Sequence, residues 1–204
     1  MANDISCVGR RKVEKLYKNE RSKMIKNKQE LKDVLEYERT LYWGSGKEAK
    51  YQYLLAVLKD HPNYRVWKYN ILLRKAGYYY FCRKKNVLKA ILYFWYCRKK
   101  NRLGRKLGIE LNERTFDKGL IIYHTQGIVV NGRAVVGKNC HLHGNNCIGT
   151  NGKTVDCPVL GDNVTLGVGA KVLGKVRIAD GIKIAAGAVV VHSFEEKGIT
   201  IGGI

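Results

Sequence analysis

The chain has 204 residues, six cysteines without a CxxC pair, and a formal net charge of +21. This length suits one domain of moderate size, or a small domain with an appendage. Residues 1–30 lack the apolar segment of a secretory signal. The longest apolar run, residues 87–97, is far shorter than the roughly 20 residues that cross a bilayer. We therefore expect a cytoplasmic protein with reduced thiols and no metal site.

Charge divides the chain into two halves. Residues 1–109 carry 28 Lys and Arg against 9 Asp and Glu, whereas residues 110–204 carry 10 against 8. Between His61 and Ile109 there are 14 basic residues and no acidic one. The basic half and the near-neutral half therefore need separate interpretations.

The basic half has the pattern of helices. Asn27 and Glu30 resemble a capping box ahead of an apolar stripe. The Trp43–Gly46 segment ends this first helix, and Gly77 separates a third helix from a fourth. We expect helices over residues 27–41, 47–58, 64–76 and 78–103. The sequence thus predicts a basic, aromatic-rich helical region over residues 1–107.

The near-neutral half repeats every six residues, and this decides its fold. An α-helix would repeat near 3.6 residues and a half-buried strand at 2. A beat of six predicts a short strand and a turn in each hexad, with three hexads in each triangular coil. We therefore predict an α+β protein in which residues 108–204 form a left-handed parallel β-helix. Ten of eleven positions on this beat are aliphatic: Val130, Val136, Leu142, Ile148, Leu160, Leu166, Val172, Ile178, Ile184 and Val190, with Thr154 the exception.

Thr154 lies in a polar segment without stacking residues, and the beat resumes in phase at Leu160. This pattern predicts a loop extruded from the coil near residues 150–158. Extruded loops on a rigid scaffold commonly carry function.

Histidine is the natural base for moving a proton at neutral pH. Of the five histidines, His61 precedes a proline at a helix end and His192 lies late in the repeats, so we expect structural roles for both. His124 stands where the repeat begins, in the segment His-Thr-Gln-Gly-Ile-Val. Because it also falls on the six-residue beat, an inward-facing core position is the alternative.

The His124 segment resembles the serine acetyltransferase-like branch of the hexapeptide-repeat acyltransferases, in which a histidine, two residues and Gly-Ile-Val precede the regular coils. The segments beginning at Leu160 and Ile184 and the closing Ile199-Thr-Ile-Gly-Gly-Ile are similar to the family's later coils. The resemblance covers about residues 107–204. It implies a homotrimer that transfers an acetyl group from acetyl-CoA to a hydroxyl.

The resemblance also implies roles for individual residues. His124 would deprotonate the acceptor, and an acidic partner maps with a one-residue gap to Glu110, with Asp117 as its competitor. Acetyl-CoA would lie along the coils at a subunit boundary, and no metal is implied. The residues expected to line its slot are Gly149, Gly167, Val168, Ala185 and Ala186.

Two departures from the family pattern bear on the acceptor. Serine acetyltransferases have an aspartate just before the histidine, where this chain has Tyr123. They also have a second histidine before a proline in the extruded loop, where this chain has Cys157. These departures favour relatives that acetylate sugars of capsular or surface polysaccharides, and serine O-acetylation of cysteine biosynthesis is the alternative.

The basic half has three interpretations. It closes the β-helix and forms a trimer, or it rests on an anionic membrane at the inner leaflet, or it binds nucleic acid. We find no nucleic-acid recognition motif and disfavour the third.

Two other classes of protein fit the sequence less well. A metal-dependent enzyme of the γ-carbonic anhydrase kind would need three suitably spaced histidines, and His141 and His143 are only two residues apart. A non-catalytic scaffold would not bind coenzyme A.

Overall fold

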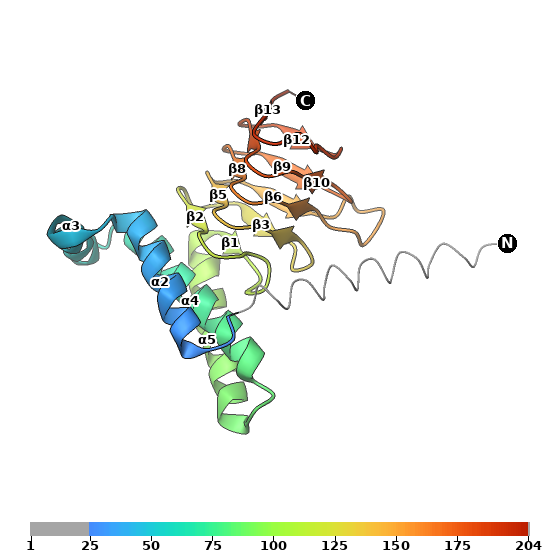
Figure 1. Cartoon of the computed structure of the whole chain (residues 1–204). Helices are drawn as coiled ribbons and strands as arrows, with labels where there is room; N and C mark the ends of the chain where they lie inside the picture. The colour runs from blue at the N-terminus through green and yellow to red at the C-terminus, as the bar shows by residue number, and fades with distance from the viewer. Residues whose placement is uncertain (1–24, 204) are drawn as a thin grey trace.

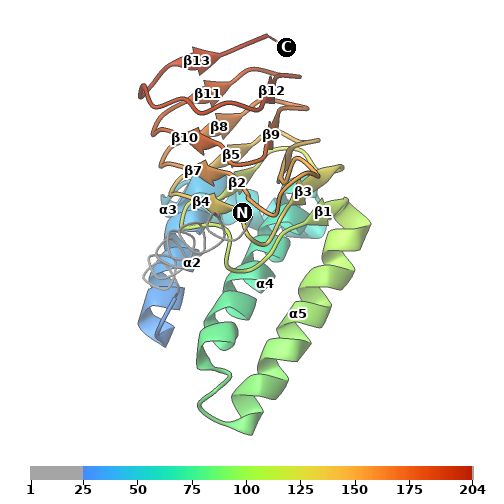
Figure 2. The ribbon, with the colours of Figure 1, turned by 90° about the vertical axis from the view of Figure 1, so that its right-hand side faces the viewer.

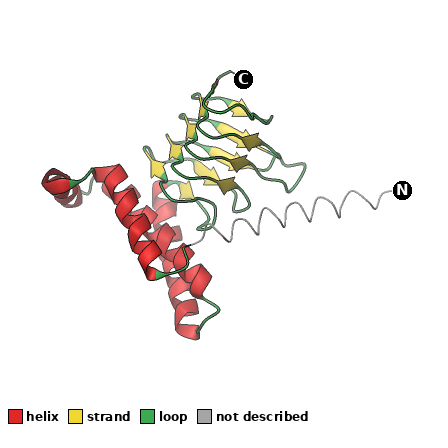
Figure 3. Cartoon of the chain, in the orientation of Figure 1, coloured by secondary structure: helices red, strands yellow, loops and turns green. Residues whose placement is uncertain are grey.

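The computed structural model describes residues 25–203 (Figure 1). The first 24 residues, on which part of the signal-segment prediction rests, and Ile204 lie outside the described residues. Within the described range, helices come first and short strands follow, and the two kinds of structure occupy separate regions (Figure 3). No helix in residues 25–203 has the length and apolar character needed to span a membrane.

Four helices and thirteen strands make up the described range. The helices are α2 (Lys28–Trp43), α3 (Gly46–Leu58), α4 (Pro62–Cys82) and α5 (Val87–Leu107). The strands are β1 (Ile109–Glu110), β2 (Ile121–Ile122), β3 (Ile128–Val130), β4 (Val135–Val136), β5 (His141–Leu142), β6 (Cys147–Gly149), β7 (Val159–Leu160), β8 (Thr165–Leu166), β9 (Lys171–Leu173), β10 (Arg177–Ile178), β11 (Lys183–Ile184), β12 (Val189–Val190) and β13 (Thr200–Ile201).

The start of the first helix follows its predicted cap. The Asn27 side chain accepts a hydrogen bond from the Glu30 backbone N–H at 2.8 Å. The Glu30 carboxylate accepts in return from the Lys26 backbone N–H at 2.7 Å, so two donors at the helix end are satisfied. Helices α2 and α3 lie within a few residues of their predicted limits, on either side of the Trp43–Gly46 break.

The predicted boundary between the third and fourth helices is wrong. Helix α4 continues through Gly77 to Cys82, and the break falls at residues 83–86. Gly77 is needed for close packing, because a Cβ there would lie 3.0 Å from the Glu113 carbonyl oxygen. The signal for the true break is Asn86, whose side chain accepts a hydrogen bond from the Lys89 backbone N–H and caps α5.

The strands form three parallel sheets that wrap around one axis, as the six-residue beat predicted (Figure 2). Their orders are β1-β3-β6-β9-β12, β4-β7-β10 and β2-β5-β8-β11-β13. In the regular coils, paired residues are 18 apart, as in Thr165 with Lys183 and Lys171 with Val189. Three hexads therefore complete one coil.

The ten aliphatic residues on the beat fill the axis of the β-helix, and each is at most 3% exposed. Thr154 is exposed. Across the segment that contains it, paired residues are 24 apart, as in Val135 with Val159. The insertion is thus one hexad long, which explains why the beat resumes in phase after β6.

A buried ion pair joins the helices to the first coil. The Glu38 carboxylate of α2 meets the Arg74 guanidinium of α4 at 2.6 Å, and both side chains are at most 6% exposed. Glu38 also accepts from the backbone N–H of Gly119, and Arg74 donates to the Phe116 carbonyl oxygen. The pair therefore satisfies backbone groups of the coil that precedes His124.

Candidate active site

One corner of the β-helix carries a column of equivalent positions from successive coils. It lies where the sheet containing β2 turns into the sheet containing β3. Backbone N–H groups of Tyr123, His143, Gly167 and Ala185 donate to carbonyl oxygens of the next coil at 2.7–3.1 Å. The column runs from two aromatic side chains to two small residues along a single edge.

His124 follows Tyr123 at the end of this column that belongs to the first coil, and its side chain is exposed. It packs over Gly144, where an added Cβ would lie 3.1 Å from the His124 Cβ. The inward-facing alternative is therefore wrong. In this first coil Ile121 pairs with His141, which is 20 residues further on instead of 18. The six-residue spacing of inward-facing positions therefore does not extend back to His124. The inward residue is Ile122, at 1% exposed.

Three aromatic side chains gather beside His124. The Tyr123 ring stacks on the His143 ring with centroids 4.4 Å apart and an interplanar angle of 23°. The Tyr123 hydroxyl lies 3.4 Å from His141 Nδ1. Burial, together with the nearby His143, lowers the pKa of His141 and favours its neutral form. Sequence reasoning gave this cluster no role, because Tyr123 and His143 come together only through the long first coil.

Asn146 supports the corner from inside. It is fully buried, and its side-chain oxygen accepts from the Gly144 backbone N–H at 2.9 Å. Its amide donates to the Gly167 carbonyl oxygen at 2.7 Å. These bonds fix the backbone beneath His124 relative to the next coil.

Four of the five predicted cofactor residues lie on this edge. Gly167 and Val168 belong to one coil, and Ala185 and Ala186 belong to the next. The coils approach closely here, since a Cβ on Gly167 would lie 2.6 Å from the Ala186 nitrogen. Val168 is 50% exposed. The edge therefore presents small and apolar residues, which would let a flexible pantetheine arm approach the backbone closely.

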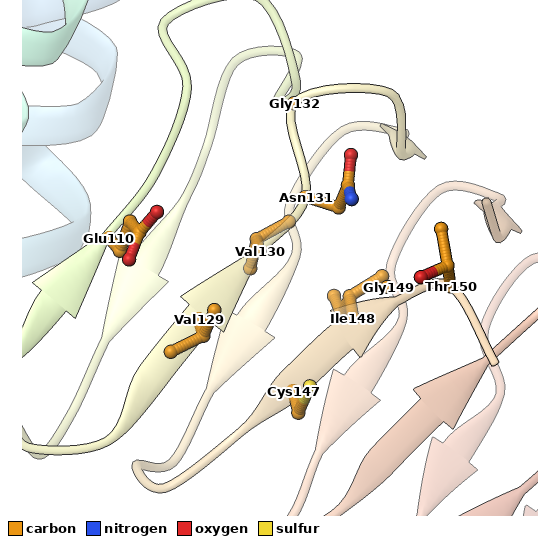
Figure 4. A pocket seen from close by; sticks show the side chains of 9 residues that line it. All are labelled: Glu110, Val129, Val130, Asn131, Gly132, Cys147, Ile148, Gly149 and Thr150. Carbon is orange, nitrogen blue, oxygen red and sulfur yellow. The ribbon is translucent and has the colours of Figure 1, made fainter. Parts of the chain in front are cut away.

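Gly149 and Glu110 lie elsewhere, in a hollow of about 350 Å³ along the outside of the sheet containing β1 (Figure 4). Glu110 pairs in register with Val129, and its side chain is exposed. No hydrogen bond joins Glu110 to His124 within residues 25–203. Gly149 lies beside Asn131, at the end of its sheet opposite to the Gly167 edge.

The other residues considered from the sequence, Asp117, His61 and His192, lie away from His124. Asp117 accepts from the Lys118 backbone N–H and lies beside β4, at a different corner from His124. His61 caps α4 by accepting from the Asn63 N–H, as a turn residue would. His192 is exposed and follows β12. Among the described side chains, no three His, Cys, Asp or Glu residues are grouped to hold a metal ion.

Comparison with known proteins identifies the family. No family model matches the chain. Serine acetyltransferase from Helicobacter pylori is 30% identical over 132 residues, which cover 64% of this chain and 70% of that protein. The chain belongs to the serine acetyltransferase family. The Synechococcus elongatus enzyme is 33% identical over 98 residues, which are 47% of this chain and only 40% of that protein's length.

Solved serine acetyltransferases share the fold, a helical region followed by a left-handed parallel β-helix. The Neisseria gonorrhoeae enzyme in complex with serine matches with a TM-score of 0.61 and 23% identity, over 86% of this chain and 68% of that one. The soybean enzyme complexed with serine matches with a TM-score of 0.56 and 26% identity, over 68% and 54%. The resemblance noted in the sequence and the predicted fold are therefore confirmed.

Proposed function

We propose that this protein is an O-acetyltransferase that uses acetyl-CoA as the donor. The observation that carries the proposal is the exposed His124 at one end of an edge of small and apolar residues, in a chain of the serine acetyltransferase family. The imidazole would take the proton of the acceptor hydroxyl as its oxygen attacks the thioester carbonyl. The carbon–sulfur bond then breaks, and the imidazolium returns the proton to the departing coenzyme A thiolate.

We propose a homotrimer with acetyl-CoA at the boundary between subunits. Gly149 and Gly167 lie at different corners of one chain, and a slot between two chains could draw on both corners. Glu110 stays our proposal for the carboxylate that orients His124, because it lies on the strand next to β3. We propose that the protein acts in the cytoplasm, where acetyl-CoA is available.

For the acceptor, we propose serine first. The relatives are serine acetyltransferases, and the two solved structures described above are complexes with serine. These relatives favour serine as the acceptor over the polysaccharide sugar that Tyr123 and Cys157 indicated. One observation keeps the sugar as a second candidate: Tyr123 stacks on His143 and provides no carboxylate for an amino group.

The test measures thiol release from acetyl-CoA with L-serine and with a panel of glycans. We expect His124→Ala to lose at least a hundredfold in rate, the lower range for a general base. His192→Ala changes an exposed histidine away from the His124 corner and should retain the rate. Full activity in His124→Ala would remove the proposed base, and release with glycans but not with serine would select the second acceptor.

A further inference from the structure

Helix α5 has an outer face that nothing in the described chain covers. Figure 2 shows α5 at the edge of the molecule, with α4 along one side. The side chains that pack against α4 and the first coil include Lys100, Gly104 and Leu107. The first turns of the outer face are apolar, and we call the following residues the α5 apolar face: Val87, Leu88, Ile91, Phe94 and Trp95, which are 45–76% exposed.

The α5 apolar face has helical spacing. Successive members lie one, three, three and one positions apart in the sequence, which places all five on one side of the helix. Such a surface is unusual for an uncovered helix, because exposed apolar residues are normally scattered singly. The structure therefore presents an organised apolar surface at the end of α5 farthest from the β-helix (Figure 2).

The surroundings of this face are basic. Lys84 and Lys85 are exposed in the turn before α5. Arg98, Arg102 and Arg105 are exposed and continue the same side of the helix toward the β-helix. The Lys99 ammonium lies 3.7 Å from the centroid of the Trp95 ring. No acidic residue occurs between His61 and Ile109, so nothing on α4 or α5 neutralises this charge.

We propose that the outer face of α5 docks on an anionic lipid surface. Apolar and aromatic side chains would enter the boundary between headgroups and acyl chains, and the arginines and lysines would meet lipid phosphates. A two-fold contact with a second copy of the chain fits this face poorly, because it would bring the uncompensated positive charges of the two copies together. Nucleic acid would satisfy the charges but leave Phe94 and Ile91 in water.

Vesicle co-sedimentation of the full chain tests the proposal. We expect binding to vesicles of phosphatidylcholine with phosphatidylglycerol, and little binding to phosphatidylcholine alone. Ile91→Ser with Phe94→Ser should lower partitioning roughly tenfold or more, from the lost apolar burial. Arg98→Gln with Arg102→Gln should lower it roughly fivefold for each charge removed.

A matched control is available on α3, where Leu54 and Leu58 are also exposed, at 53% and 73%. Leu54→Ser with Leu58→Ser should leave vesicle binding unchanged. Equal loss in this control, equal binding to uncharged vesicles, or no vesicle binding by the wild type would overturn the proposal. Light scattering gives a further decisive outcome: if the α5 variant lowers the mass of the assembly and the wild type ignores vesicles, the face joins copies of the chain.

Discussion

At the scale of single residues, the His124 corner depends on small side chains where coils approach most closely. The Gly167 backbone lies so near the next coil that a methyl group would contact the Ala186 nitrogen at 2.6 Å and the Ala185 carbonyl carbon at 3.0 Å. Both contacts are with backbone, which cannot rotate away. The absence of a side chain at Gly167 thus shapes the edge proposed to bind the pantetheine arm.

Gly167→Ala should therefore destabilise the fold by about 1–3 kcal/mol through overpacking and should weaken coenzyme A binding. Urea unfolding and calorimetry measure the two effects. Gly149→Ala is the control, since a Cβ there meets only the Asn131 Cβ at 3.8 Å and the free energy of unfolding should hardly change. Equal stability of the two variants would show that the Gly167 edge has room to relax.

Among the side chains of the site, His124 was found from its motif, whereas the Tyr123–His143 stack was not. The stack depends on the 20-residue spacing of the first coil, and a strict count of six or eighteen does not bring the two residues together. The sequence identified Tyr123 as a departure from the family but could not show what its ring contacts. The supporting role of Asn146 likewise depends on its burial and bonding partners, which a linear pattern does not contain.

At the scale of elements, local signals and tertiary contacts account for different boundaries. The Asn27 cap, the Trp43–Gly46 break and the hexads are local, and they predicted α2, α3 and the β-helix. Gly77 predicts a break because glycine is a poor helix former. Its use is set instead by the Glu113 backbone, which packs against it from the β-helix. A contact of this kind is invisible before the chain is folded.

The ion pair between α2 and α4 gives a prediction at this scale. Glu38→Gln leaves the Arg74 guanidinium buried without its counter-charge, and removal of one partner of a buried pair costs about 3–5 kcal/mol. Urea unfolding should show this loss. Glu36→Gln breaks the exposed pair with Arg39 on the same helix and should leave the unfolding midpoint unchanged. If both variants unfold alike, the Glu38 pair does not anchor α2.

At the scale of the whole molecule, two buried ion pairs lie where the basic helical region meets the near-neutral β-helix. The first is Glu38 with Arg74. The second joins Lys100 of α5 to Glu113 at 2.9 Å, with both side chains 5% exposed, and Lys100 also donates to the Leu111 carbonyl oxygen. Both pairs therefore link the helices to the segment that leads into the first coil.

The second pair should make the stability of the whole protein depend on pH. Burial alone would raise the pKa of Glu113, but the Lys100 ammonium and the Tyr93 hydroxyl, which donates to Glu113 Oε1 at 3.0 Å, outweigh it and lower that pKa. A carboxyl group whose pKa is lower in the folded state stabilises the fold above its unfolded pKa of about 4.3. That contribution is lost as the pH falls through the folded value.

We therefore expect the free energy of unfolding to fall as the pH is lowered from about 5. Glu113→Gln should be less stable than the wild type at pH 7, because Lys100 is left unpaired, and should lose less on acidification. Comparing the two proteins in urea at each pH isolates the effect, since exposed carboxyl groups such as Asp180 are present in both. Parallel pH curves for the two proteins would mean that Glu113 does not couple protonation to the junction of helices and β-helix.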